Sequence, residues 1–162
     1  MTTTVTTDIE NATFTVAAEY DADPDRIWQL WADPRQLERW WGPPTHPATV
    51  TDHDLSGGGL VRYYMNSPQG EKFGGGWRVL RVESPRLLEF EDYFADDAGD
   101  QNADLPVSRS TVTIELTSNG RTRMTITARY ESAAAMEKVL EMGMEEGITL
   151  ALGQIDAVLA ER

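Results

Sequence analysis

Cysteine is absent from the 162 residues, so the chain can form neither a disulfide nor a thiolate metal site. Histidine is scarce: only His46 and His53 are present, and their spacing matches no zinc motif. No apolar run approaches the roughly 18 residues that a membrane-spanning helix needs, and residues 1–12 lack the features of a secretory signal. These absences predict a cytoplasmic protein that holds no metal and no cofactor and does not insert into a membrane.

Basic side chains are also few, because 14 Lys and Arg stand against 27 Asp and Glu, for a formal net charge of −13. Such a charge repels phosphate backbones, so we expect no binding to nucleic acid. The length suffices for one hydrophobic core. We expect a loose, threonine-rich tail over residues 1–11 and a single domain over residues 12–162.

Strand patterns dominate the middle of the chain. Alternation from Asn11 to Tyr20 predicts a strand with one buried face. Asp23-Pro24 and Asp33-Pro34 each combine an N-cap with a proline at the first helical position, which predicts two short helices. Further extended segments are expected over residues 48–52, 60–65, 73–82, 87–94, 107–116 and 121–130, the last two joined at Asn119-Gly120.

One long helix is expected at the end of the chain. Ser132 provides an N-cap, and apolar or small residues then recur every three or four positions over roughly 25 residues. Short turns between consecutive strands imply antiparallel pairing. The predicted class is α+β with a helix-grip layout: a curved antiparallel sheet of about six or seven strands wrapped around a long C-terminal helix, with two short helices after the first strand.

Three stretches with this layout resemble a known family. They are DADPDRIWQLWADPRQLERWWGP (residues 21–43), the block from Gly57 to Phe90, and GMEEGITLALGQIDAVL (residues 143–159). Together they resemble the activator of heat-shock ATPase homologue family (AHSA-like), within the START-like, Bet v 1-like (SRPBCC) superfamily. The resemblance covers residues 12–160. Members often carry Gly-Trp in the last helix, where this chain has Gly143-Met144.

Apolar candidates for a ligand site come from several predicted elements. Trp40 and Trp41 are adjacent on a helix of about one turn, so both rings cannot enter the core on the same face, and the pattern leaves open which one lines a pocket. Gly143, Gly147 and Ala151 thin one face of the last helix, either to bring it close to the sheet or to leave room for a bound molecule. The remaining candidates are Tyr63, Met65, Trp77, Phe90, Met136, Leu140 and Met144.

Polar candidates are few. Strand alternation places Asp92 either among apolar neighbours, where burial would raise its pKa, or at an open strand end in water. Asp92, Tyr63 and His53 are therefore the candidate acid–base groups, and no catalytic triad is present. The glycines at 74–76 lack the Gly-Lys-Ser/Thr of a phosphate loop, so a bulge or a close backbone approach explains them better.

Three functions remain open. The first is non-catalytic binding of a small hydrophobic or amphipathic molecule, such as a lipid, between the sheet and the last helix. The second is an enzyme of the polyketide cyclase, aromatase or hydrolase kind that uses acid–base groups in the same cavity. The resemblance also implies the third, a co-regulator of a chaperone ATPase in a stress response. The sequence leaves a homodimer open.

Overall fold

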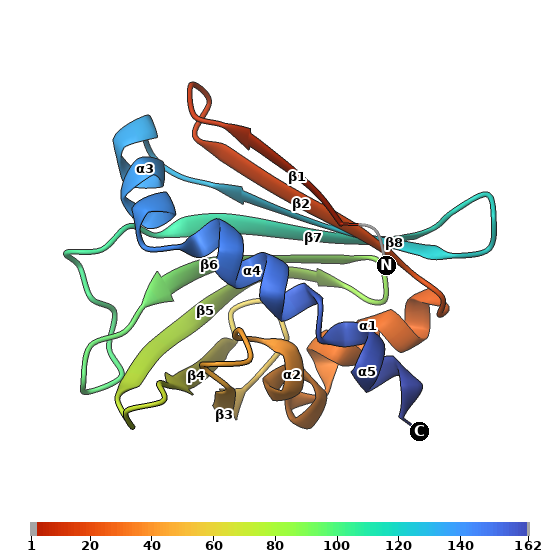
Figure 1. The fold of residues 1–162 in the computed structure, drawn as a ribbon, viewed down its shortest axis with the longest axis horizontal. Helices are drawn as coiled ribbons and strands as arrows, with labels where there is room; N and C mark the ends of the chain where they lie inside the picture. The colour runs from red at the N-terminus through yellow and green to blue at the C-terminus, as the bar shows by residue number, and fades with distance from the viewer. Residues whose placement is uncertain (1–2, 162) are drawn as a thin grey trace.

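The computed structural model describes residues 3–161 and consists of one antiparallel sheet with helices on one of its faces (Figure 1). Its eight strands are β1 (Thr3–Asp8), β2 (Thr13–Tyr20), β3 (Ala48–His53), β4 (Leu60–Asn66), β5 (Lys72–Glu83), β6 (Leu87–Phe94), β7 (Ser108–Leu116) and β8 (Thr122–Arg129), in the spatial order β1-β2-β8-β7-β6-β5-β4-β3. The predicted α+β helix-grip class is confirmed, with eight strands in place of six or seven.

The additional strand is β1, which lies in the segment predicted to be a loose tail. It pairs with β2 along its whole length, from Thr3 opposite Ala18 to Asp8 opposite Thr13. Threonine and valine are β-branched and favour extended backbone, and Val5 packs against the core. The prediction of a tail is therefore wrong for residues 3–8, because strand propensity and pairing with β2 outweigh the polar composition; residues 1–2 of the predicted tail lie outside the described residues.

Two short helices close one end of the sheet: α1 (Pro24–Ala32) and α2 (Pro34–Trp40). Both start as predicted. The Asp23 side chain accepts from the Arg26 backbone N–H at 2.8 Å, and the Asp33 side chain accepts from the Arg35 N–H at 2.9 Å. Their buried faces meet through Trp31 and Trp40, whose ring centroids are 4.8 Å apart in an edge-to-face arrangement.

The predicted long C-terminal helix is broken into three: α3 (Ala133–Glu141), α4 (Met144–Leu152) and α5 (Ile155–Ala160). The first break is at Gly143, whose φ of 87° lies in the left-handed region that ends helices. The prediction of one continuous helix is wrong because apolar spacing does not show which glycine is a helix end. Figure 1 shows α4 crossing in front of the sheet and α5 beside α1.

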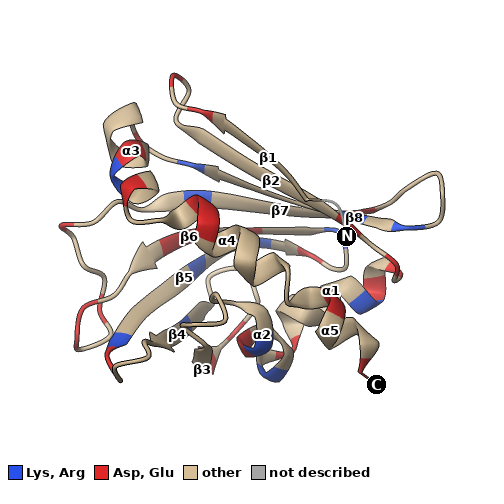
Figure 2. Cartoon of the chain, viewed as in Figure 1, with Lys and Arg blue, Asp and Glu red and all other residues tan. Residues whose placement is uncertain are grey.

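Acidic residues are spread over loops and helix surfaces in the view of Figure 2, where they do not gather into one patch. Exposed ion pairs also join neighbouring strands, as between Arg123 and Glu19 at 3.1 Å. The charge pattern therefore does not identify a binding face in this view. No helix within residues 3–161 is long and apolar enough to cross a membrane.

Candidate functional site

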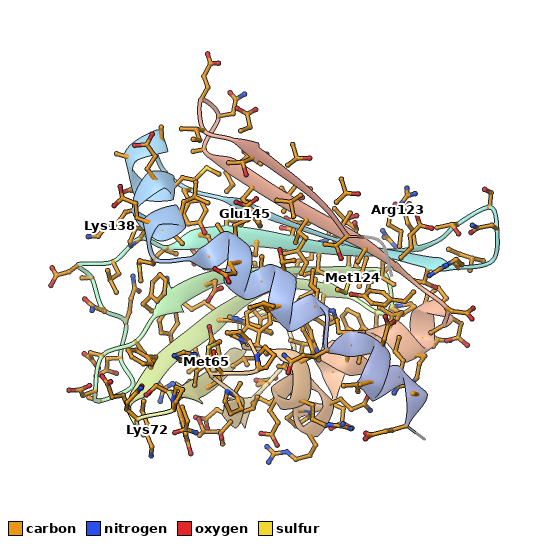
Figure 3. All side chains as sticks on the ribbon, viewed as in Figure 1. Met65, Lys72, Arg123, Met124, Lys138 and Glu145 are labelled. Atoms are coloured by element: carbon orange, nitrogen blue, oxygen red, sulfur yellow. The ribbon has the colours of Figure 1, made fainter. Side chains whose placement is uncertain are left out.

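A hollow of about 1450 Å³ lies between the inner face of the sheet and the segment formed by α3 and α4. Its apolar walls include Phe14, Val16, Met65, Phe90 and Ile126 from strands of the sheet and Ile148 from α4. The space continues around the sheet edge to Arg62 and Tyr64. In Figure 3, Met65 lies towards the Lys72 end of the sheet, whereas Met124 lies towards the α1 end. Ligand sites typically measure about 300–1,000 Å³, so this hollow has room for a small molecule.

The hollow is open because α4 presents almost no side chain towards it at two positions. A Cβ atom added to Gly143, at the start of α4, or to Gly147 would meet no atom within 4 Å beyond its chain neighbours and the nearby helix backbone. Close packing of the helix on the sheet, one of the two explanations of these glycines, therefore does not apply to either position. Gly143 also has a conformational reason to be glycine, whereas Gly147 lies inside α4 with ordinary backbone geometry.

The two adjacent tryptophans have different positions. Trp40 is fully buried in the core, and its indole N–H donates to the Leu30 carbonyl at 3.0 Å. Trp41 lines the hollow and packs edge-to-face against Trp77, with centroids 5.0 Å apart. The structure thus places Trp41 at the hollow and Trp40 in the core.

Asp92 is half-buried on the wall of the hollow, on the same face of β6 as Phe90 and Phe94 and not at the end of that strand. The Tyr63 hydroxyl donates to its Oδ1 at 3.3 Å. Burial raises the pKa of Asp92 to about 7, and the hydrogen bond from Tyr63 opposes that shift. Two of the three predicted acid–base groups therefore come together, and one of them titrates near neutral pH.

Gly75 permits this contact. Tyr63 is on β4 and Asp92 is on β6, so the phenol must cross the intervening strand β5. Gly75 lies directly opposite Tyr63, and a Cβ there would clash with the Tyr63 hydroxyl. Gly76 likewise lies opposite Tyr93, and a Cβ there would clash with the Tyr93 ring. Two of the three consecutive glycines are therefore explained by the close approach of a tyrosine ring to the β5 backbone.

Two buried donors lie around the Tyr63 oxygen. The Nε1 atoms of Trp41 and Trp77 are buried and have no partner of normal hydrogen-bond geometry in the described part of the chain. Burial, and then the charge of Asp92, raise the pKa of Tyr63 well above its ordinary value, while the two indole N–H groups act in the opposite direction. Tyr63 therefore remains a neutral donor towards Asp92.

Three polar side chains of the wall that lie around Asp92 were not predicted: Ser108, Ser110 and Tyr130. Ser108 is the register partner of Asp92, and its Oγ lies 3.4 Å from that of Ser110. Burial, together with the charge of Asp92, raises the pKa of Tyr130. We call Tyr63, Asp92, Ser108, Ser110 and Tyr130 the polar cluster. Strand alternation could have found its missing members, because they continue the inward faces of Val112 and Ala128.

The other predicted residues divide into two groups. Met65, Phe90, Gly143, Met144 and Gly147 line the hollow with Trp41, Tyr63 and Asp92. The remaining residues pack in or against the core and do not line the hollow; they are Trp40, Trp77, Met136 and Leu140. His53 is also apart from the hollow, since its Nε2 pairs with the Trp31 carbonyl oxygen at 2.9 Å.

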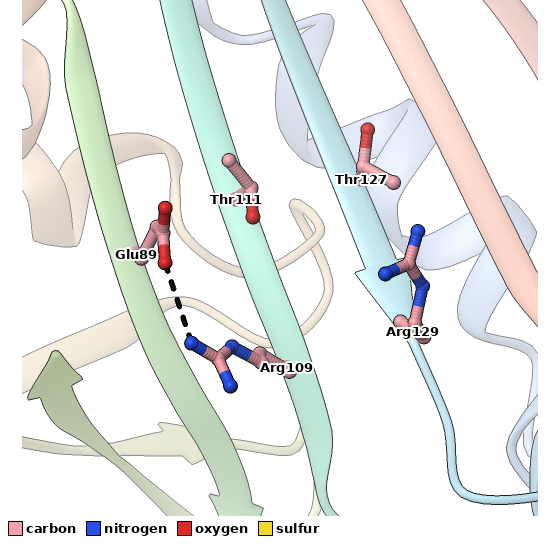
Figure 4. A pocket seen from close by; sticks show the side chains of 5 residues that line it. All are labelled: Glu89, Arg109, Thr111, Thr127 and Arg129. Carbon is pink, nitrogen blue, oxygen red and sulfur yellow. Dashed lines mark ion pairs between the residues drawn. The ribbon is translucent and has the colours of Figure 1, made fainter. Parts of the chain in front are cut away.

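A smaller hollow of about 270 Å³ lies on the outer face of the sheet, between Glu89, Arg109, Thr111, Thr127 and Arg129 (Figure 4). Its ion pair joins Arg109 Nη2 to Glu89 at 3.6 Å, and the Arg109 side chain is 64% exposed. Exposed pairs of this kind contribute little energy. Within residues 3–161, no group of three or more His, Asp or Glu residues is placed to hold a metal ion. The hollow under α4 is therefore the candidate site.

Comparison with known proteins gives the family. The family model described as "Activator of Hsp90 ATPase homolog 1-like protein" matches residues 21–160. None of the curated proteins matches the chain.

Solved structures match over nearly the whole chain. An NMR structure of an Arthrobacter aurescens protein is 50% identical, with 98% of this chain and 92% of that chain covered and a TM-score of 0.92. The crystal structure of Ms6760 from Mycobacterium smegmatis is 48% identical, with 98% and 97% covered and a TM-score of 0.89. An AHSA1 protein from Silicibacter pomeroyi, 22% identical over 92% of this chain and 98% of that chain, shares the fold with a TM-score of 0.74. The chain therefore belongs to the family of Activator of Hsp90 ATPase homolog 1-like proteins.

Proposed function

We propose that the chain binds a small hydrophobic or amphipathic molecule in the hollow under α4. The observation that carries the proposal is the open space beneath Gly143 and Gly147, which no side chain of the described residues fills. Apolar walls with a few convergent polar groups are typical of small-molecule sites. The polar cluster provides such groups within the same hollow.

The expected affinity is modest. Burying about 300 Å² of apolar ligand surface contributes roughly 7 kcal/mol before the costs of association. Those costs amount to several kcal/mol, so we expect dissociation constants no tighter than the micromolar range.

The test fills the hollow from α4. Gly147→Phe would direct a ring into the open space, whereas Leu150→Phe, on the same helix, changes a side chain that is 45% exposed. The uncharged fluorescent probe N-phenyl-1-naphthylamine should bind the parent chain and Leu150→Phe alike, and bind Gly147→Phe at least about tenfold more weakly. Circular dichroism confirms that both variants fold. No binding to the parent chain, or equal binding to all three, would contradict the proposal.

A second candidate function is acid–base catalysis in the same hollow, of the cyclase, aromatase or hydrolase kind. The contact between Tyr63 and Asp92 favours it, because general acid–base groups work best when their pKa lies near the ambient pH. Asp92→Asn and Tyr63→Phe would each abolish such turnover while leaving ligand binding measurable. A chaperone role has only the family description in its support.

A further inference from the structure

We infer that the polar cluster selects ligands that carry an uncharged hydroxyl group and disfavours ligands that carry a carboxylate. This inference rests on the proposed function, since it names the chemical class that the hollow would hold. It makes Asp92 the residue that determines specificity.

The first step is the unequal use of the two carboxyl oxygens of Asp92. Oδ1 accepts from Tyr63, whereas Oδ2 has no hydrogen-bond partner within residues 3–161. No ion pair in that range neutralises Asp92 either. Arg62 and Lys72 line the hollow only where it continues around the sheet, and Lys72 Nζ lies over the outward-facing Tyr64 ring, 4.5 Å from its centroid. Asp92 is thus a carboxyl group with one oxygen available to a ligand.

The second step is the chemistry of the neighbouring groups. The hydroxyls of Ser108, Ser110 and Tyr130 can each donate or accept a hydrogen bond. A ligand hydroxyl can donate to Asp92 when that residue is ionised and accept from it when it is protonated, while also pairing with a neighbouring hydroxyl. It therefore matches the cluster in both protonation states of Asp92.

Charged head groups match less well. A ligand carboxylate would place a second negative charge beside Asp92 on an apolar wall, where like charges repel strongly. An ammonium group would attract Asp92, but it cannot accept a hydrogen bond and would have to lose its hydration. The rest of the ligand faces Phe14, Val16, Phe90 and Ile148, so its body must be apolar. Apolar alcohols and phenols fit this description.

The experiment uses four probes that share one ring system: naphthalene, 2-naphthol, 2-naphthoate and 2-naphthylmethylammonium. Dissociation constants are measured at pH 7.5 by NMR titration of the ¹⁵N-labelled chain. We expect 2-naphthol to bind the parent chain at least about tenfold more tightly than 2-naphthoate, and more tightly than the other two. Asp92→Asn should reduce the naphthol-to-naphthoate ratio to within about threefold.

Glu91→Gln is the matched control, because Glu91 is the neighbouring residue on β6 and faces outward to Arg78, 3.3 Å away. It removes the same charge from the other face of the sheet and should leave the ratio unchanged. A reduction of the ratio by Glu91→Gln as large as that by Asp92→Asn would assign the selectivity to net charge and overturn the inference.

A pH series on the parent chain gives a second measurement that does not depend on the folding of Asp92→Asn. Lowering the pH from 7.5 to 5.5 should strengthen 2-naphthoate binding several-fold and leave 2-naphthol unchanged, because Asp92 takes up a proton over this range. Besides the polar cluster, His46, Asp52, Arg62, Glu71, Lys72, Asp96 and Asp97 also line the hollow. The series is repeated on His46→Gln to separate the contribution of that histidine.

The outcomes separate the inference from the proposed function. Equal binding of 2-naphthol and 2-naphthoate, or tightest binding of the ammonium probe, overturns the inference. Ligand binding still stands in that case if Gly147→Phe weakens all the probes. Failure of all four probes to bind overturns both.

Discussion

The two ends of the sheet are both covered by helices, yet only one of them is filled. At the α1–α2–α5 end, Ile27, Leu30 and Trp31 are each 0% exposed and close the space against the strands. At the α3–α4 end, the face of α4 towards the sheet carries Gly147, which has no side chain to fill the space. The hollow lies beneath this residue. Coverage by a helix therefore does not by itself make a core, because the side chains beneath it decide whether the space is filled.

A wall of aromatic rings separates the two ends. Trp77 stacks on Phe90 with centroids 4.2 Å apart, and Trp31 lies 5.7 Å from Trp77. Trp41 and Tyr63 lie on the hollow side of this wall, 6.0 Å apart. The hollow thus has a closely packed boundary on the side of the core, and Tyr63 of the polar cluster packs against it.

The largest expected difference between the two ends is in stability. Trp31→Ala should lower the free energy of unfolding by about 3–5 kcal/mol, because it removes a fully buried ring from the closed end. Ile148→Ala, at the open end, should cost about 1 kcal/mol or less, since its half-buried side chain borders empty space. Urea denaturation measures both. Similar losses for the two variants would show that the ends are equally well packed.

The next prediction concerns the pH dependence of stability, which should come from the open end. The pKa of Asp92 is about 7 in the folded chain, against 3.8 for an aspartate in water. The folded state therefore holds a proton that the unfolded chain releases, and this contribution to stability is complete below pH 3.8 and is lost as the pH rises through 7. The difference between the two pKa values corresponds to a change in the free energy of unfolding of at most about 4 kcal/mol between low and high pH.

Asp92→Asn removes this dependence. Its free energy of unfolding should exceed that of the parent chain by about 1–3 kcal/mol at pH 8 and differ little at pH 4. Denaturation at a series of pH values measures the effect. A variant that is less stable than the parent chain at pH 8 would show that the Asp92 charge is compensated in the folded state.

The smallest effects come from the two glycines above the hollow, and they should have opposite signs. Gly147→Ala should raise the free energy of unfolding by about 0.5–1 kcal/mol, because alanine favours the helix and its Cβ meets open space. Gly143→Ala should lower it by about 1–2 kcal/mol, because the φ of 87° disfavours any residue with a Cβ. Thermal denaturation followed by circular dichroism resolves the difference. Equal effects would mean that Gly143, between α3 and α4, does not adopt the left-handed backbone conformation.

Much of the fold could be predicted because local signals and tertiary structure agree. The two Asp-Pro pairs start α1 and α2, and the turn at Asn119-Gly120 joins β7 and β8 as alternation requires. The exceptions have local causes. The strand at residues 3–8 was hidden by its polar composition, and the break at Gly143 is a backbone conformation that side-chain spacing does not encode. Leu116 continues the alternation of Val112 and Ile114 on β7, yet it is 62% exposed because it lies at the strand end.

The candidate site was predicted in part. Alternation identified Tyr63 and Asp92 separately, but their contact crosses β5 and depends on Gly75, which is a property of the register. An apolar pattern does not identify Ser108 and Tyr130, because the inward faces of β7 and β8 become polar at these strand ends. The sequence also predicts Trp40 and Trp77 as ligand-site residues, although neither lines the hollow, because large aromatic residues occur both in cores and in pocket walls.

The position of Gly147 has a consequence for protein engineering. Gly147 contributes no side chain to the sheet or to the aromatic wall. A series of Ala, Val, Leu and Phe at position 147 should therefore reduce the volume of the hollow in steps and leave the rest of the fold unchanged. The same substitution is open to natural selection, so we expect a single change at position 147 to alter the size of ligand that a protein of this architecture can hold.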